Sequence, residues 1–216
     1  MAYTLPNGST MDVAATYDAA VPMTSITNAA PAVVTSTAHG LTTGDIVLVT
    51  SGWSRFNNRA FVVGTVTIDT FQLAGTDTTD IVVYPAGGGV GTAKAAATYV
   101  QINQITGVEF SGGDISFLDV QFLESDSQVQ IPTVKSAISM ILTVADDPGQ
   151  AYLPVLEAYD ANRSINILRL NLVNGNTILY PAITTINATP TVTINELLTR
   201  SISAAVQAQP TRYERT

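Results

Sequence analysis

The strongest constraint on the fold is a two-residue alternation of apolar and polar side chains in the C-terminal half of the chain. From Ile138 onwards, Met140, Leu142 and Val144 share one parity and the residues between them take the other. Successive side chains of a β-strand point to opposite faces, so this pattern predicts a strand with one face in a core. Similar runs are separated by Gly, Pro, Asn and Asp, which favour turns. We therefore expect a mainly β protein.

A β-hairpin is predicted around Asn174-Gly175. Apolar residues alternate with polar ones over 168–172, and a second alternating run begins at Ile178. An Asn-Gly pair between two such runs is a strong hairpin signal, because both residues accept the backbone of a tight turn.

A third alternating run, residues 192–206, is unusually long. Its even positions are mainly apolar and its odd positions are mainly Thr, Asn and Ser. At about 3.3 Å per residue a single strand of this length would reach roughly 50 Å, far beyond an ordinary strand. The run therefore predicts one long strand that bends or spans a subunit boundary.

A single helix is predicted after Asp147-Pro148, a pair typical of helix starts. Pro154 is acceptable in a first turn, so we expect the regular helix to begin near residue 150 and to end near residue 162. We interpret Asp146-Asp147 as capping residues rather than as a paired acid site. The apolar stripe has the spacing of one helix face and consists of Tyr152, Val155, Leu156 and Tyr159.

Composition suggests a protein whose surface is largely covered by copies of itself. Charged residues make up only 12% of the 216 residues, about half the usual share. The net charge of −8 argues against tight nucleic-acid binding, which needs Lys and Arg. The absence of cysteine excludes disulfides and thiolate chemistry. No apolar run is long enough for a membrane span and no secretory signal opens the chain, so we expect a soluble protein that assembles in the cytoplasm.

The N-terminal half has a different amino-acid composition, which predicts a separate module over residues 22–92. It is dense in Thr, Val and Gly, and strands are expected at 46–49, 61–66 and 70–73. The glycine-rich segment 87–91 is interpreted as a flexible joint at its exit. Residues 1–21 and 93–216 then form one domain, with 1–21 as an N-terminal arm.

Residues 22–92 resemble a small β-module of phage virion proteins that is often labelled after the ubiquitin-activating enzyme half-domain. Asn58 stands where this pattern usually has glycine, and Asn tolerates the left-handed backbone of such a turn. The motifs that carry the resemblance are Ala30-Pro31-Ala32-Val33-Val34-Thr35, Ala38-His39-Gly40-Leu41, Gly44-Asp45-Ile46-Val47, residues 57–61, Thr70-Phe71-Gln72-Leu73, and Tyr84 followed by Gly87-Gly88.

The flanking parts contain four segments whose order and spacing are informative together: Asn7-Gly8-Ser9-Thr10, Gln130-Ile131-Pro132-Thr133-Val134-Lys135-Ser136, Val144-Ala145-Asp146-Asp147-Pro148 and Thr189-Pro190-Thr191-Val192-Thr193. Through these segments the flanking parts are similar to the major tail tube proteins of siphophages, the long-tailed bacteriophages. The resemblance implies a β-sandwich or barrel with one flanking helix, and the module 22–92 would be an inserted small β-domain on the outer surface.

The same resemblance implies a structural virion protein and not an enzyme. The subunits would form hexameric rings that stack around a tape measure protein and meet tail terminator and distal tail proteins at the ends. Phage DNA would pass through the lumen during ejection without specific binding. We therefore expect the protein in the virion tail, after assembly in the cytoplasm of a bacterial host, and we expect no catalytic, cofactor or metal site.

Three sets of residues are predicted to act in this assembly. The lumen candidates are acidic or hydroxyl-bearing, because such a wall does not bind phosphate: Asp114, Asp119, Thr193, Asn195, Thr199 and Ser201. The segment 124–133 is predicted to be a long loop that reaches the neighbouring ring, with the candidates Glu124, Asp126, Gln128, Gln130 and Pro132. The terminal contact candidates are Tyr3, Leu5, Arg212, Tyr213 and Arg215.

Alternatives remain at this stage. The polar parity of 192–206 is equally typical of a solvated sheet face. The chain also fits another virion component, such as a tail terminator, a baseplate protein or a decoration protein. A carbohydrate-binding β-protein would use Trp53, although a core position for Trp53 is the simpler interpretation. His39 is the only histidine, and we expect it to stabilise a turn.

Overall fold

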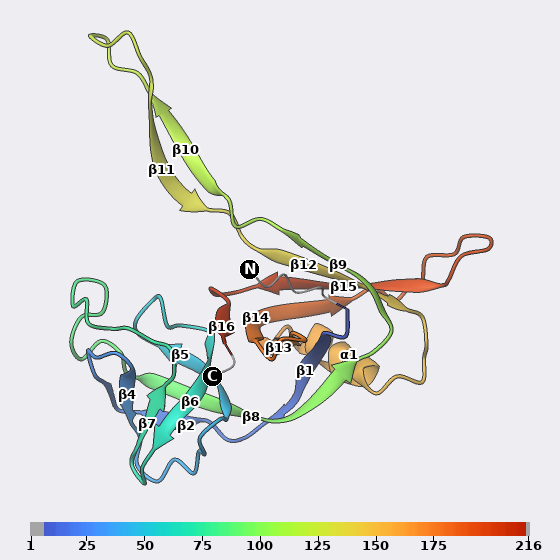
Figure 1. Cartoon of the computed structure of the whole chain (residues 1–216), viewed down its shortest axis with the longest axis horizontal. Coiled ribbons are helices and arrows are strands. Elements are labelled where there is room, and N and C mark those ends of the chain that lie inside the picture. The colour runs from blue at the N-terminus through green and yellow to red at the C-terminus, as the bar shows by residue number, and fades with distance from the viewer. Residues whose placement is uncertain (1–6, 215–216) are drawn as a thin grey trace.

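The computed structural model describes residues 7–214, which form sixteen strands and one helix, with fourteen of the strands in one antiparallel sheet (Figure 1). The strands are β1 Thr10–Tyr17, β2 Val21–Met23, β3 Ser25–Ile26, β4 Ala32–Thr35, β5 Ile46–Ser51, β6 Arg59–Val66, β7 Thr70–Leu73, β8 Gly91–Ile102, β9 Ile105–Ser111, β10 Ile115–Val120, β11 Val129–Lys135, β12 Ser139–Ala145, β13 Asn166–Asn171, β14 Thr177–Ile186, β15 Thr199–Val206 and β16 Thr211–Tyr213. The main path is β3-β4-β7-β6-β5-β8-β1-β13-β14-β15-β12-β9, with β16 beside β14 and β2 beside β8. The prediction of a mainly β fold with one helix is confirmed.

The strands from β8 to β9 along this path curl around one core. Met11 of β1 and Met140 of β12 belong to the same buried cluster although three strands of the sheet separate them. The ring of Phe110 on β9 lies 5.6 Å from that of Tyr180 on β14, as expected if the sheet curls over its core. This curled sheet corresponds to the expected sandwich or barrel, and its predicted core parity at Met140, Leu142 and Val144 is confirmed.

The helix α1 (Tyr152–Asn162) covers the core of the curled sheet, with Tyr152, Leu153 and Leu156 buried. Pro154 lies in its first turn, as expected. The capping prediction is wrong, because the N-cap is Ala151 without a side-chain cap. Asp147 instead accepts hydrogen bonds from the Gly149 N–H (3.0 Å) and the Gln150 side chain (2.6 Å), which hold the turn before the helix.

A second core lies among β2–β7 and the first half of β8, around the aromatic rings of Trp53, Phe56, Phe61 and Phe71. The three strands predicted here are confirmed as β5, β6 and β7. Strand β8 serves both cores, since Leu48 of β5 pairs with its Lys94 and Val13 of β1 pairs with its Val100. We call the part built on this second core the small module, and its boundaries at 22 and 92 remain a proposal.

The glycine segment 87–91 is not a flexible joint. Gly91 is the first residue of β8 and pairs with Ser51. A Cβ atom on Gly91 would lie 1.9 Å from the carbonyl oxygen of Thr50, and one on Gly88 would lie 3.1 Å from the indole nitrogen of Trp53. These glycines are needed because the backbone packs closely against its neighbours.

The prediction of one strand over 192–206 is also wrong. Strand β15 begins only at Thr199, and residues 187–198 form a loop whose ends are joined by the bridge between Thr191 and Thr199. Asn195 has a left-handed φ of 63°, which interrupts an extended backbone. From Thr199 onwards the predicted parity holds, because Ile202 and Ala204 are buried.

The small module and the curled sheet are joined by a third apolar cluster and by the last strand. Ala14, Ile167 and Leu179 of the curled sheet pack with Ile46 and Ala60 of the small module. From β16, the hydroxyl of Tyr213 accepts a hydrogen bond from the Val62 N–H (2.9 Å) and donates one to the Ala74 carbonyl (3.1 Å). The small module is therefore attached through buried contacts as well as through the chain.

Candidate assembly interfaces

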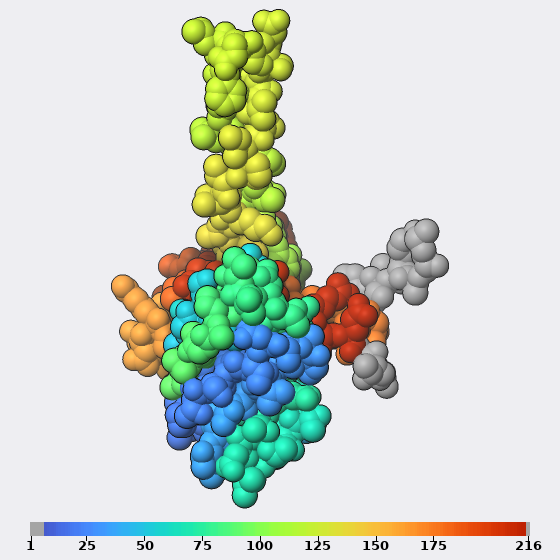
Figure 2. Space-filling view, turned by 90° about the vertical axis from the view of Figure 1, so that its left-hand side faces the viewer, coloured from blue at the N-terminus to red at the C-terminus, as the bar shows by residue number. Residues whose placement is uncertain are grey.

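The hairpin of β10 and β11 projects from the body, and Figure 2 shows it standing clear of the other described segments. At its tip, the loop 121–128 exposes 56% of Phe122 and all of Leu123. An isolated two-stranded hairpin has no core of its own and is marginal in water. Its exposed apolar side chains therefore indicate a surface that a partner covers.

The two faces of this hairpin differ. Leu118 pairs with Ile131 and Val120 with Val129, so these four apolar side chains share one face, which we call the arm face. On the other face Gln130 donates a hydrogen bond to Asp119 (2.9 Å), next to the pair of Phe117 and Pro132. The arm face is thus the more apolar side of the hairpin.

The predicted long loop 124–133 is wrong in its second half. Glu124, Asp126 and Gln128 lie in the loop, whereas Gln130 and Pro132 lie in β11. Proline is tolerated there because both strands of a lone hairpin are edge strands. Sequence reasoning missed the apolar residues of the hairpin. The signal that could have found them is Phe122-Leu123 beside Glu124, apolar side chains in a polar segment with no strand to bury them.

A kink separates the hairpin from the curled sheet. Gly112 and Gly113 have φ values of 85° and 87°, which other residues rarely adopt. A Cβ atom on Gly112 would lie 1.9 Å from the Ala137 carbonyl oxygen, so the two chains cross too closely for a side chain. Two successive left-handed residues end β9 and set the direction of the hairpin.

The loop 187–198 is a second exposed apolar surface, which we call the distal loop. It is ordered by its own hydrogen bonds, including Thr191 N–H to the Thr199 carbonyl (2.8 Å) and Thr189 N–H to the Asn187 side chain (3.0 Å). Its exposed large apolar residues are Val192 (76%), Ile194 (88%), Leu197 (63%) and Leu198 (44%). The lumen candidates Thr193 and Asn195 lie in this loop and not in a strand wall.

The outer face of β15, β12, β9 and the C-terminal end of β14 is bare and rich in hydroxyl groups, whereas earlier along β14 the same face is covered where Leu179 packs on the small module. Ser203 is exposed while its neighbours Ile202 and Ala204 are buried, which fixes the side that faces away from the core. Among the described residues, this face carries the carboxylate of Glu109 and no Lys or Arg. Its members, set by the strand register, are Ile183, Thr185, Thr199, Ser201, Ser203, Ala205, Ser139, Ile141, Thr143, Ala145, Gly107, Glu109 and Ser111, of which seven carry hydroxyl groups. Of the predicted lumen residues, the structure brings only Thr199 and Ser201 onto it. Asp114 lies at the base of the hairpin and Asp119 on its β10 strand.

The predicted terminal contact residues lie in different environments. Tyr3, Leu5 and Arg215 lie outside the described residues. Arg212 is exposed. Tyr213 was expected to anchor the tail on a neighbour, but it is engaged within its own chain, and burial raises its pKa.

Residues considered for chemistry have structural roles. Trp53 is 2% exposed and donates its indole N–H to the Pro85 carbonyl (2.9 Å), so it offers no sugar-binding platform. The Nε2 atom of His39 lies 3.0 Å from the Thr67 carbonyl oxygen, and its Nδ1 accepts the Leu41 N–H. Both interpretations made from the sequence are confirmed.

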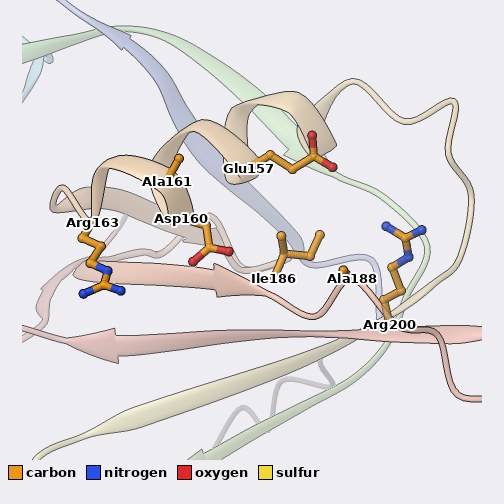
Figure 3. Close-up of a pocket in the computed structure, with 7 residues that line it drawn as sticks. All are labelled: Glu157, Asp160, Ala161, Arg163, Ile186, Ala188 and Arg200. Carbon is orange, nitrogen blue, oxygen red and sulfur yellow. The ribbon is translucent and has the colours of Figure 1, made fainter.

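The hollow beside α1 does not assemble a reactive group. Figure 3 shows that its charged side chains come from separate places, with Glu157, Asp160 and Arg163 on or just after α1 and Arg200 on β15. Arg200 is instead paired with Asp146 at 2.5 Å. Over residues 7–214 no group of three or more His, Cys, Asp or Glu side chains is placed to hold a metal ion. Within the same residues no helix is long and apolar enough to cross a membrane.

A mainly β chain with two uncovered apolar projections and a bare polar sheet face is a subunit of a larger assembly. Residues 51–215, more than half of the chain, match the family model described as phage tail tube protein. The chain therefore belongs to the phage tail tube protein family and is a structural component of a phage tail.

The chain is also similar to solved structures at low identity. They include a chain in the virion of a native gene transfer agent particle (11% identity, TM-score 0.42, covering 53% of this chain and 88% of that one). Another is in the sheath-tube complex of an extracellular contractile injection system in its extended state (15%, TM-score 0.37, 53% and 83%). A third is in the cap that terminates the tube of the anti-feeding prophage (17%, TM-score 0.37, 53% and 83%). These TM-scores lie below 0.5 and carry no argument, and no curated protein matched significantly.

Proposed function

We propose that the protein is the major tail tube subunit of a siphophage. Copies join side by side into hexameric rings, and the rings stack into a tube whose lumen conducts DNA at ejection. The mechanism is assembly and not catalysis. The observation that carries this proposal is the bare, hydroxyl-rich face of β14, β15, β12 and β9.

That face has the chemistry that a DNA conduit needs. Each Lys or Arg in contact with a phosphate displaces counterions and creates an attractive site. On this wall the carboxylate of Glu109 repels phosphates, and the neutral Ser and Thr hydroxyls do not attract them as Lys or Arg would. We therefore assign Thr199 and Ser201 to the lumen wall and add Ser203 and Thr143. Asp114 and Asp119 extend the acidic character along the hairpin.

The remaining parts are assigned to contacts. The hairpin with its tip loop reaches the neighbouring ring, and Arg212 contributes to inter-ring contacts. Within the predicted N-terminal arm 1–21, residues 10–17 belong to the curled sheet as β1, between β8 and β13, and are not assigned to such a contact. The small module lies outside, since a folded module inside the lumen would block DNA. The partners are further copies of the chain, the tape measure protein in the lumen, and terminator and distal tail proteins at the two ends. Assembly takes place in the host cytoplasm.

Electron microscopy of the concentrated purified protein tests the proposal directly. We expect hollow tubes, with six subunits around each ring in class averages. Capped rings or single rings that never stack would favour a terminator, baseplate or decoration protein. A monodisperse monomer at every concentration would refute self-assembly.

The cysteine-free sequence allows a sharper test of the lumen wall. Ser203→Cys should react with a small maleimide both before and after tube formation, because the lumen contains water. A maleimide carrying a large polymer should label it only before assembly. The matched control is Ile68→Cys, which lies on the small module with 79% exposure and should react with both reagents throughout. Polymer labelling of Ser203→Cys in intact tubes would place this face outside.

A further inference from the structure

The arm face and the distal loop lie at opposite ends of the same strands. Ser139 of β12 pairs with Ser111 of β9 at the end from which the hairpin leaves. At the other end, Ala145 of β12 pairs with Thr199 of β15, where the distal loop returns to the sheet. Figure 1 shows the two projections leaving the body at these two ends.

Both surfaces are apolar and uncovered in the single chain. On the arm face Leu118, Val129 and Ile131 are 56%, 51% and 47% exposed. In the distal loop Ile194 and Leu197 are 88% and 63% exposed. Neither carries a Lys or Arg among the described residues, and the one charged side chain on them is that of Glu196 in the distal loop.

We propose that the arm face of one subunit packs on the distal loop of a subunit in the neighbouring ring. The inference rests on the proposed tube and names the surface that receives the hairpin. Two different surfaces at opposite ends of a chain give a head-to-tail contact, and such a contact produces a filament when its repetition does not close into a ring. The six residues of β10 extend the arm by roughly 20 Å, enough to overlap a neighbour along the stacking direction.

This contact also accounts for features that the single chain leaves unexplained. It covers the apolar side of a hairpin that has no core of its own. It gives the alternating apolar residues of the distal loop a partner, although they face no core within their own subunit. It uses the kink at Gly112 and Gly113, which directs the hairpin away from its own sheet.

Cross-linking of mixed single-cysteine variants tests the contact. Subunits carrying Leu118→Cys and subunits carrying Leu197→Cys are mixed, assembled and treated with a short bismaleimide. We expect covalent heterodimers in tubes and none at concentrations below assembly. The matched control mixes Leu118→Cys with Ile68→Cys, an apolar position on the small module that is more exposed than Leu197, and should give none.

Two results would overturn the inference. One is a failure of the Leu118→Cys and Leu197→Cys pair to cross-link in tubes that electron microscopy shows to be intact, which leaves the proposed tube standing. The other is efficient linking of Leu118→Cys to itself, which would mean that two hairpins pair. If the unmodified protein forms no tubes under any condition, the proposed function fails as well.

A second measurement uses the critical concentration for assembly. Leu197→Asp should raise it by about 10-fold or more, because a charge would be buried against the arm face. Ile68→Asp should leave it unchanged. Both residues are exposed in the single chain, so thermal unfolding of the unassembled subunits should stay the same. An unchanged critical concentration for Leu197→Asp contradicts the proposed contact.

Discussion

Replacing Tyr213 with phenylalanine tests how the small module is attached to the curled sheet. The hydroxyl of Tyr213 lies between Val62 of β6 and Ala74, the residue that follows β7, one position beyond the pair of Val63 and Leu73. It accepts the Val62 N–H at 2.9 Å and donates to the Ala74 carbonyl at 3.1 Å. The variant keeps the ring in the junction cluster and leaves both backbone groups without this partner.

The expected loss follows from the burial of those two groups. Leaving a buried backbone group unpaired costs about 1–3 kcal/mol. Val62 and Ala74 are only half-buried, so water compensates part of the loss, and we expect about 2 kcal/mol in total. For a chain of this size that lowers Tm by roughly 4–8 °C. Urea and thermal unfolding of the unassembled subunit measure it, and the loss should fall on the transition of the small module if the two cores unfold separately.

The pH dependence of the same variant provides an independent check. Burial raises the pKa of the Tyr213 phenol above its ordinary value near 10. A raised pKa means that the fold favours the protonated phenol, so this stabilisation is complete below about pH 10 and is lost as the pH rises further. The stability difference between wild type and Tyr213→Phe should therefore stay constant from neutral pH to about pH 9 and narrow above pH 10.

Tyr159→Phe is the matched control. Tyr159 is a half-buried tyrosine of α1 whose hydroxyl has no hydrogen-bond partner among residues 7–214. We expect its replacement to change stability by less than about 0.5 kcal/mol. If Tyr213→Phe also changes stability by less than about 0.5 kcal/mol, the hydroxyl does not stabilise the junction and the reasoning is refuted.

Two further predictions concern the kink at Gly112 and the partly buried ion pair between Asp12 of β1 and Arg169 of β13. Gly112→Ala should increase hydrogen exchange in the hairpin and lower stability by at least about 1 kcal/mol, because its Cβ atom would meet the Ala137 oxygen at 1.9 Å with φ at 85°. Gly107→Ala, where a Cβ atom meets nothing within 4 Å, should be neutral. Asp12→Ala should cost about 2 kcal/mol in urea unfolding, since it removes the 2.7 Å ion pair that holds Arg169. A loss below about 0.5 kcal/mol would show that water replaces the carboxylate.

Local alternation predicted the strands that have one face in a core. At β12 and in β15 the parity read from the sequence is the parity that the core selects. The Asn174-Gly175 turn was equally readable, since Gly175 has a φ of 86°. The same rule failed at 192–198, where alternating residues look like a strand but form the distal loop. Alternation indicates that one side of a segment is buried. It does not show whether the residues that bury it belong to the same chain or to a partner.

The candidate interfaces were less predictable than the fold. We predicted Gln130 and Pro132 to be loop residues because proline is rare in sheets. Proline is accepted in β11 because this strand pairs on one side only and needs no backbone N–H on the other. We expected Tyr213 to be a free anchor because nothing near it in sequence shows that its hydroxyl bridges Val62 and Ala74.

The sequence by itself determined the β class, the helix and the scarcity of charge, because these depend on residues close together in the chain. The tertiary structure alone decided that β8 serves both cores, that the hydroxyl-rich face is left bare, and that two apolar surfaces lie at opposite ends of the sheet. Those features depend on strand order and register, which arise from contacts between segments far apart in the chain, such as the contacts of Asp12 with Arg169, 157 residues apart, and of Val62 with Tyr213, 151 residues apart.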